Sequence, residues 1–79
     1  MIPLKEFHKV KYLQLGLNIA YYRRKKGLTQ EKLAELINIS RTHISNIEAT
    51  KPDKSLSLDV LFDIADALDV EVGKLFEIR

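Results

Sequence analysis

The stretch that decides the fold of this 79-residue chain is residues 29–48, TQEKLAELINISRTHISNIE. Thr29 and Ser40 each precede a short segment with apolar residues at helical spacing, and their hydroxyl oxygens are suited to accept a hydrogen bond from a backbone N–H in the first turn of a helix. Asn38 lies between the two segments and tolerates the left-handed backbone that a tight turn requires. The pattern predicts two short helices joined by a sharp turn.

Both predicted helices begin in the same way. Leu28 precedes the first capping residue and Leu33 follows it, while Ile39 and Ile44 flank Ser40 at the same distances. An apolar residue before the cap and another four positions after it form a hydrophobic staple, which fixes how the chain enters a helix. The residues expected to face a shared core are Leu33, Ala34, Ile37, Ile44 and Ile47. The implied geometry is a helix-turn-helix.

The charge of the chain is small but unevenly distributed. Residues 1–54 hold eleven Lys and Arg against five Asp and Glu, a net charge of +6, and residues 55–79 hold two against six, a net charge of −4. A basic amino-terminal part that carries the helix-turn-helix suits a polyanion such as a nucleic acid. Charge alone leaves a second interpretation open, in which both groups are solvated helix faces.

The composition argues against several classes of protein. The chain has no cysteine, no apolar run of about 18 residues and no signal-peptide pattern, so we expect a cytoplasmic protein. His8 and His43 are the only histidines, and no carboxylate cluster with metal-ligand spacing surrounds either. There is no nucleophile–base set and no glycine-rich phosphate loop. We therefore expect neither an enzyme nor a cofactor.

The rest of the chain also favours helices. Residues 1–12 form an extension whose apolar spacing favours a helical segment after Pro3, either separate from the next helix or continuous with it. The first defined helix is expected over Leu13–Lys26, ending before Gly27. Further helices are expected over about 30–37, 41–49, 57–68 and 72–76, and Ser57 is the expected cap of the third of these. The prediction is an all-α chain of five helices, or six if the extension forms a helix of its own. The remaining residues expected to face inward are Leu15, Ile19, Tyr22, Leu58, Leu61, Ile64, Ala65 and Leu68.

Several of these segments, at their mutual spacing, resemble a known family. They are Leu15-Gly16-x-x-Ile19, then Arg23, then Gly27-Leu28-Thr29-Gln30-x-x-Leu33-Ala34, then Ile44-Ser45-x-Ile47-Glu48, then Ser57-Leu58-x-x-Leu61-x-x-Ile64-Ala65-x-Ala67-Leu68 and Leu75-Phe76. Together they resemble the Cro/CI-type (XRE-like) helix-turn-helix regulators. The resemblance implies a five-helix, lambda-repressor-like DNA-binding domain over residues 13–79 and a DNA-binding transcription regulator. Asn38 stands where that family usually has glycine.

The second helix of the motif has a polar outward face. With Ile44 turned to the core, a helical wheel places four residues on the outer side: Arg41, Thr42, Ser45 and Asn46. The major groove of DNA admits a helix and offers hydrogen-bond partners to side chains of this kind. The wheel alone leaves a merely solvated face equally open, but the resemblance also assigns base contacts to these positions. We therefore predict that these four residues read base edges.

A second set of residues is predicted to contact phosphates. Gln30 opens a helix whose amino-terminal end favours an anion, and the resemblance assigns it a phosphate contact. The full predicted set is Thr29, Gln30, Ser40, His43, Lys51 and Lys54, with a simply exposed histidine as the alternative for His43. The resemblance further implies that Arg23 and Glu48 form a structural ion pair between the first and third helices.

The predicted partners are a palindromic operator in double-stranded DNA and a second copy of the chain, with no membrane and no small-molecule ligand. The dimer surface is expected at Val72, Leu75, Phe76 and Ile78, with Ile2, Phe7 and Val10 as a second candidate. A homodimeric repressor is the main hypothesis. The alternatives are an antitoxin or restriction-modification controller with the same fold, and a protein-interaction module that does not use DNA. The sequence does not identify the operator, the regulated genes or any activating role.

Overall fold

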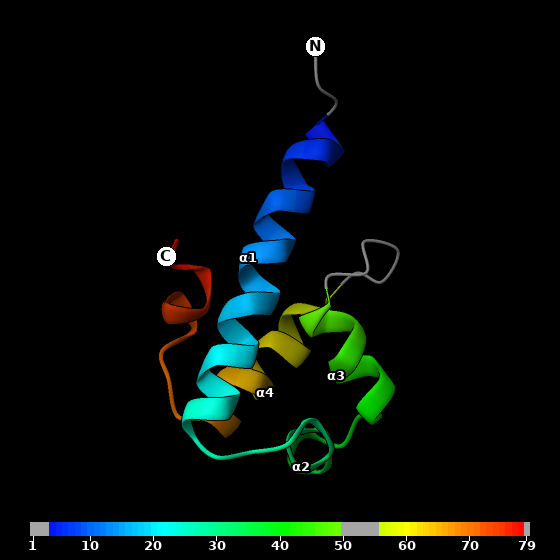
Figure 1. Cartoon of the computed structure of the whole chain (residues 1–79), viewed down its shortest axis with the longest axis vertical. Helices are drawn as coiled ribbons and strands as arrows, with labels where there is room; N and C mark the ends of the chain where they lie inside the picture. The colour runs from blue at the N-terminus through cyan, green and yellow to red at the C-terminus, as the bar shows by residue number, and fades with distance from the viewer. Residues whose placement is uncertain (1–3, 50–55, 79) are drawn as a thin grey trace.

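The polypeptide is helical throughout the part that the structure describes. The structure is a computed structural model and describes residues 4–49 and 56–78, with side chains from His8 onward. Its elements are α1 (Leu4–Lys25), α2 (Gln30–Ile37), α3 (Arg41–Glu48), α4 (Leu58–Leu68) and the 3-10 helix η1 (Val72–Phe76), as shown in Figure 1. These ranges contain no strand, which confirms the predicted all-α class.

The number of α-helices differs from the prediction. Five helices were expected, and the described residues form four α-helices and one 3-10 helix. The difference lies in the last element, which has only five residues and includes Gly73. Its backbone N–H groups reach back three residues, from Lys74 to Glu71 O at 2.9 Å and from Glu77 to Lys74 O at 3.4 Å. So short a segment forms the tighter 3-10 turn.

α1 is longer than the helix predicted from Leu13. It begins at Leu4 and continues without a break to Lys25, so most of the predicted extension and the first helix are one element. Gly16 is buried within it and does not interrupt it. The amino-terminal turns of α1 project beyond the other helices (Figure 1). No helix of the described ranges is both long and apolar enough to cross a membrane.

The predicted helix caps are confirmed. Thr29, Ser40 and Ser57 have extended backbones, and the side-chain oxygen of each accepts a hydrogen bond from the N–H three residues later, at 3.0–3.1 Å. Asn38 adopts the left-handed conformation expected of the turn, with φ 58° and ψ 47°. Gly27, at φ +78°, ends α1 in the same region. These local features set the angles at which α2 and α3 follow α1.

The core lies where α1, α2, α3 and α4 meet. Its buried residues are Leu15, Ile19, Leu33, Ala34, Ile44, Ile47, Leu61, Ile64, Ala65, Leu68 and Leu75. Tyr22 and Ile37 pack against this core and are partly buried, as expected. The prediction was wrong for Leu58, which is 66% exposed. Leu58 is the first residue of α4, and the side chains that reach the core begin further along that helix.

A buried amide holds the carboxyl-terminal segment against α1. The side chain of Asn18 is fully buried, and its Nδ2 donates to the backbone carbonyls of Leu75 at 2.9 Å and Glu77 at 2.6 Å. Its Oδ1 accepts from Gln14 Nε2 at 3.1 Å. A buried polar group stabilises a fold only when it is hydrogen-bonded, and Asn18 meets that condition. The contacts tie η1 and the residues after it to the middle of α1.

Candidate nucleic-acid interface

α3 has a buried face and a polar face. Ile44 is fully buried and marks the core side. On the other side, Arg41 and Thr42 are exposed, and Ser45 and Asn46 are partly buried. All four predicted base-reading residues therefore have side-chain surface available in one region of α3. Their residue types can donate or accept hydrogen bonds at base edges, so the predicted role is compatible with their placement.

The first turns of α2 and α3 carry three of the predicted phosphate contacts. Thr29 Oγ1 accepts from the N–H of Lys32, and Ser40 Oγ accepts from the N–H of His43, each at 3.0 Å. A hydroxyl that accepts in this way still has its own proton to donate. The imidazole-bearing residue His43 is partly buried in the first turn of α3. Contact of these groups with phosphates stays a prediction.

Arg23 and Glu48 form the ion pair that the family resemblance implied. Arg23 Nε donates to Glu48 Oε2 at 2.6 Å, and Arg23 Nη2 donates to Glu48 Oε1 at 3.0 Å. The two side chains are only 8% and 6% exposed. Arg23 Nη1 also donates to the carbonyl of Leu28 at 2.7 Å. The guanidinium thereby joins the end of α1, the start of the motif and the last residue of α3.

The same carboxylate also holds Gln30. Gln30 Nε2 donates to Glu48 Oε1 at 3.0 Å, so the first side chain of α2 is fixed against the last side chain of α3. An amide nitrogen carries two protons, and this bond uses one of them. Because Gln30 is only partly buried, the second proton is available to an acceptor outside the chain. A phosphate oxygen at the amino-terminal end of α2 would be such an acceptor.

Two of the predicted phosphate contacts cannot be placed. Lys51 and Lys54 lie outside the described residues. Among the described lysines near the motif, Lys32 forms an exposed i,i+3 pair with Glu35, with Nζ 3.5 Å from Oε2. Exposed pairs of this kind are weak, so the pair does not prevent Lys32 from meeting an anion.

The four residues of the predicted dimer surface lie in different environments. Leu75 is fully buried in the core of its own chain, and Val72 packs against that core. Phe76 is 57% exposed and Ile78 is 90% exposed. Leu75 therefore has no surface to offer a partner, because its side chain completes the packing of η1 on α1. Only the other residues of this set can form part of an interface.

Several of the polar contacts described above were not predicted from the sequence. The hydrogen bond from Gln30 to Glu48 joins side chains 18 positions apart, and the bonds of Asn18 reach 57 and 59 positions along the chain. One signal for Asn18 was present, because Leu15, Asn18, Ile19 and Tyr22 follow helical spacing and place an amide beside the core face. No local pattern indicates which carbonyls that amide meets.

The fold and this polar cluster define the class of the protein, a helix-turn-helix protein in which the motif is fixed to α1 by a buried ion pair. Residues 19–75 match the helix-turn-helix family HTH_3. Because the match covers most of the chain, the protein belongs to this family of transcription regulators.

Two relatives carry names that describe regulators. The chain is 36% identical over 61 residues to control protein C.SmaI of Serratia marcescens, a match that covers 77% of this chain and 70% of that protein. It is 35% identical over 63 residues to the immunity repressor protein of Bacillus phage phi105, covering 80% of this chain and 42% of the repressor.

Two solved structures have the same fold. One is the restriction-modification controller protein C.AhdI of Aeromonas hydrophila, with a TM-score of 0.79 and 31% identity over 85% of this chain and 98% of that one. The other is SinR, the master regulator for biofilm formation, in complex with DNA. It has a TM-score of 0.72 and 30% identity over 80% of this chain and 98% of that chain. These similarities confirm the Cro/CI-type resemblance of the sequence.

Proposed function

We propose that this transcription regulator is a cytoplasmic, sequence-specific repressor that binds a palindromic operator as a homodimer. Residues 13–79 form the DNA-binding domain, and residues 4–12 of the amino-terminal extension lengthen its first helix. α3 enters the major groove, where Arg41 and Asn46 contact purine edges and Thr42 and Ser45 contact neighbouring bases. α2 crosses the backbone, where Gln30 donates to a phosphate.

The observation that carries this proposal is the network of Arg23, Glu48 and Gln30. A buried bidentate ion pair connects α1 to α3, and the same carboxylate fixes the amide at the start of α2. The two helices that would contact DNA are thus held to one another by polar contacts as well as by apolar packing. Binding then requires little ordering of side chains, which favours affinity. SinR, which shares the fold, has a solved structure in complex with DNA, and this supports DNA binding by the present chain.

Selection of binding sites from a random duplex library, at near-physiological salt, tests the proposal. We expect enrichment of a palindrome whose half-sites lie about one helical turn apart, roughly 34 Å. Enrichment of a single half-site would support sequence reading by α3 but contradict the dimer. Failure of a folded protein to enrich any sequence would favour an interaction module that does not use DNA.

A restriction-modification controller is the second candidate. Two similarities favour it, those to control protein C.SmaI and to the controller C.AhdI. The test is the genomic position of the selected operator. A controller is expected to bind upstream of an adjacent gene pair for a nuclease and a methyltransferase. An operator upstream of unrelated genes would favour a phage-type or general repressor, and one upstream of a toxin gene would favour an antitoxin.

A further inference from the structure

α1 is apolar on two opposite faces. Leu15 and Ile19 are 6% and 0% exposed and face the core. On the other side of the helix, Val10 is 68% exposed, Leu13 48% and Leu17 53%. A surface helix normally turns polar residues to solvent and keeps one apolar stripe for the core. The outward apolar residues of α1 therefore need an explanation other than the packing of this chain.

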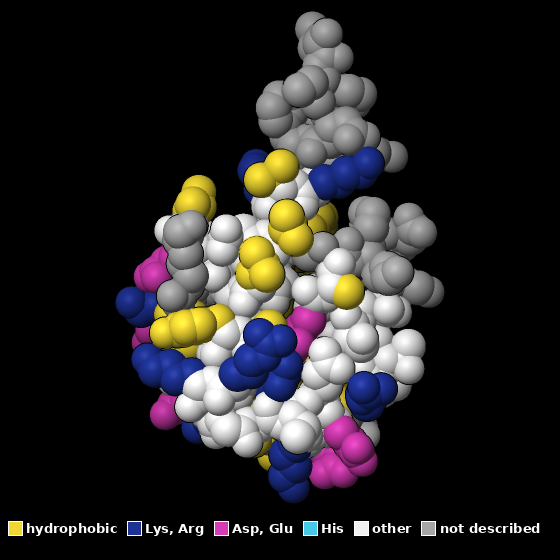
Figure 2. Space-filling model, viewed as in Figure 1, with side chains coloured by type: hydrophobic (Ala, Val, Ile, Leu, Met, Phe, Trp, Pro, Cys, Tyr) yellow, Lys and Arg dark blue, Asp and Glu magenta, His cyan; other side chains and the backbone are white. Residues whose placement is uncertain are grey.

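The exposed residues form a continuous stripe. Val10, Leu13, Leu17 and Tyr21 follow one another at intervals of three, four and four residues, and Tyr21 is 42% exposed. At 100° per residue they fall within about 80° of one another on the helix surface. Figure 2 shows hydrophobic side chains following one another down α1 on the face toward the viewer. We call these four residues the α1 stripe.

We propose that the α1 stripe is the contact between two copies of this chain, packed with their α1 helices antiparallel. The 3–4 spacing is that of helices that interlock their side chains, and such a stripe is complementary to itself under two-fold symmetry. This proposal names the surface of the dimer postulated under the proposed function. The stripe replaces the carboxyl-terminal segment as the centre of that surface.

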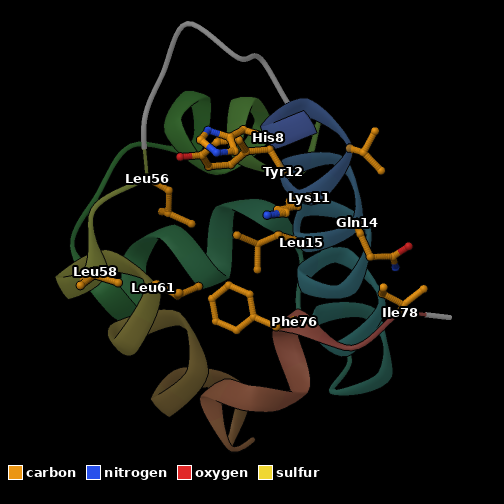
Figure 3. Close-up of a pocket in the computed structure, with 11 residues that line it drawn as sticks. His8, Lys11, Tyr12, Gln14, Leu15, Leu56, Leu58, Leu61, Phe76 and Ile78 are labelled. Carbon is orange, nitrogen blue, oxygen red and sulfur yellow. The ribbon is translucent and has the colours of Figure 1, made fainter. Parts of the chain in front are cut away.

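The surface around the stripe extends the contact. An apolar groove of about 600 Å³ lies against the amino-terminal half of α1, mainly on the side of Leu15, and Val10 and Ile78 are among the residues that line it. Figure 3 shows Ile78 close to Gln14 of α1, with Phe76 further into the groove. Taking roughly 200 Å² for a fully exposed large side chain, the stripe and Ile78 offer about 600 Å² per copy. This is the lower end of the range for stable interfaces, about 600–1,000 Å² per partner.

The antiparallel orientation follows from the position of α3 and therefore rests on the proposed function. In Figure 2 hydrophobic side chains along α1 face the viewer, and in Figure 1, which has the same view, α3 lies to one side of α1. A two-fold axis perpendicular both to α1 and to the viewing direction makes the two α1 helices antiparallel and leaves both copies of α3 on one side of the dimer. An axis parallel to α1 would place the two α3 helices on opposite sides, where one duplex does not reach both.

The first test is self-association without DNA, measured by sedimentation of the full chain. Leu17→Glu is expected to raise the dimer dissociation constant at least about tenfold, because a charge would be buried without a partner. Leu36→Glu on α2 is a matched control, since Leu36 is also 53% exposed, and it is expected to leave self-association unchanged. Circular dichroism checks that each variant keeps its helices. A monomeric parent chain, or equal behaviour of the two variants, would overturn the proposal.

The second test uses the absence of cysteine from the chain. Val10→Cys and Tyr21→Cys are made separately and oxidised alone and as a mixture. Antiparallel pairing brings position 10 of one copy close to position 21 of the other. A disulfide requires a short separation between the two Cα atoms. Only the mixture of the two variants is therefore expected to cross-link. Cross-linking of each variant alone would contradict the antiparallel orientation. No cross-link in a chain that sediments as a dimer would assign the contact to another surface.

These measurements separate the two proposals. Both are made without DNA, so a chain that dimerises through α1 but selects no sequence refutes the proposed function and leaves the dimer surface standing. A monomeric chain that selects a half-site refutes the dimer surface and the homodimer of the proposed function, and it leaves sequence reading by α3 standing.

Discussion

At the scale of single residues, Glu48 connects α3 to both α1 and α2. Its carboxylate accepts two hydrogen bonds from Arg23 and one from Gln30, and it is almost fully buried. Breaking a buried ion pair by removing one partner leaves the other charge without compensation, whereas replacing both partners by apolar groups is often neutral. The contribution of the ion pair to the stability of the fold can therefore be separated by experiment from its role in positioning Gln30.

Glu48→Ala is expected to lower the free energy of unfolding by about 3–5 kcal/mol, because the Arg23 guanidinium stays buried without its partner. Denaturant unfolding followed by circular dichroism measures the change. Glu35→Ala is the control, since its pair with Lys32 is about 60% exposed and should contribute no more than about 1 kcal/mol. A loss at Glu48 no greater than at Glu35 would contradict a structural role for the buried pair. The double variant Arg23→Met/Glu48→Leu should recover most of the stability, but it would not restore the hydrogen bond that Gln30 donates to Glu48.

Arg41→Ala and Gln30→Ala are expected to weaken DNA binding in different ways. A bidentate contact of Arg41 with guanine would contribute about 1–3 kcal/mol on the preferred site, and its loss would relax one base position. Loss of a phosphate contact by Gln30 would weaken binding to all sequences more evenly. Titration of both variants with the selected operator and with random duplex measures this. Equal losses on the two DNAs for Arg41→Ala would refute base reading by Arg41.

At the scale of elements, the sequence predicts the features that depend on near neighbours. The caps at Thr29, Ser40 and Ser57 and the left-handed turn at Asn38 depend on a few adjacent residues, and the structure confirms them. The helical segment predicted after Pro3 does begin at Leu4, but the sequence did not fix that it is one helix with the segment from Leu13, and it did not predict the 3-10 form of η1. Periodicity places the apolar face of a helix better than its end, and a five-residue segment carries too little pattern to distinguish an α-turn from a 3-10 turn.

In the candidate site, too, the features that depend on near neighbours were predicted and the long-range contacts were not. The polar face of α3 could be predicted because Ile44 and the helical period fix which side chains point outward. The ion pair of Arg23 with Glu48 came from the family resemblance, and the bond between Gln30 and Glu48 was not predicted. Contacts between residues 18 or more positions apart depend on how the helices cross, which no local pattern specifies. The burial of Leu75 belongs to the same group.

Two capping serines provide a comparison between elements. Ser40 and Ser57 make the same hydrogen bond, at 3.0 and 3.1 Å, at the starts of α3 and α4. Replacing either by alanine should cost about 1 kcal/mol of stability. Only Ser40→Ala is expected to weaken DNA binding as well, because Ser40 opens the helix proposed to enter the groove. Thermal unfolding and operator titration of both variants measure the two effects. A similar loss of operator affinity in Ser57→Ala would contradict the proposed contact of Ser40 with a phosphate.

At the scale of the whole molecule, the two parts of the chain carry opposite net charges. The basic part, residues 1–54, contains the helix-turn-helix, and the acidic part, residues 55–79, contains α4 and η1. A net charge of +2 conceals this separation. The excess positive charge of the basic part lies mainly on α1 and Lys26, because α2 and α3 together hold two cations and three carboxylates. The acidic end opposes nonspecific wrapping of DNA around the molecule. DNA affinity is therefore expected to depend on a small number of phosphate contacts.

The salt dependence of operator binding counts these contacts. The logarithm of the binding constant should fall linearly with the logarithm of salt concentration, with a slope of about −0.9 for each phosphate neutralised. Lys51→Ala and Lys54→Ala should each make the slope shallower by about one if each lysine neutralises a phosphate. Lys74→Ala is the control, because Lys74 lies in the acidic part and pairs with Glu77 at 3.2 Å, and its slope should match that of the parent chain. An unchanged slope in both of these lysine variants, together with a steep slope in the parent chain, would assign the phosphate contacts to other cations. Among these, Lys32 lies on α2 and Arg41 on α3.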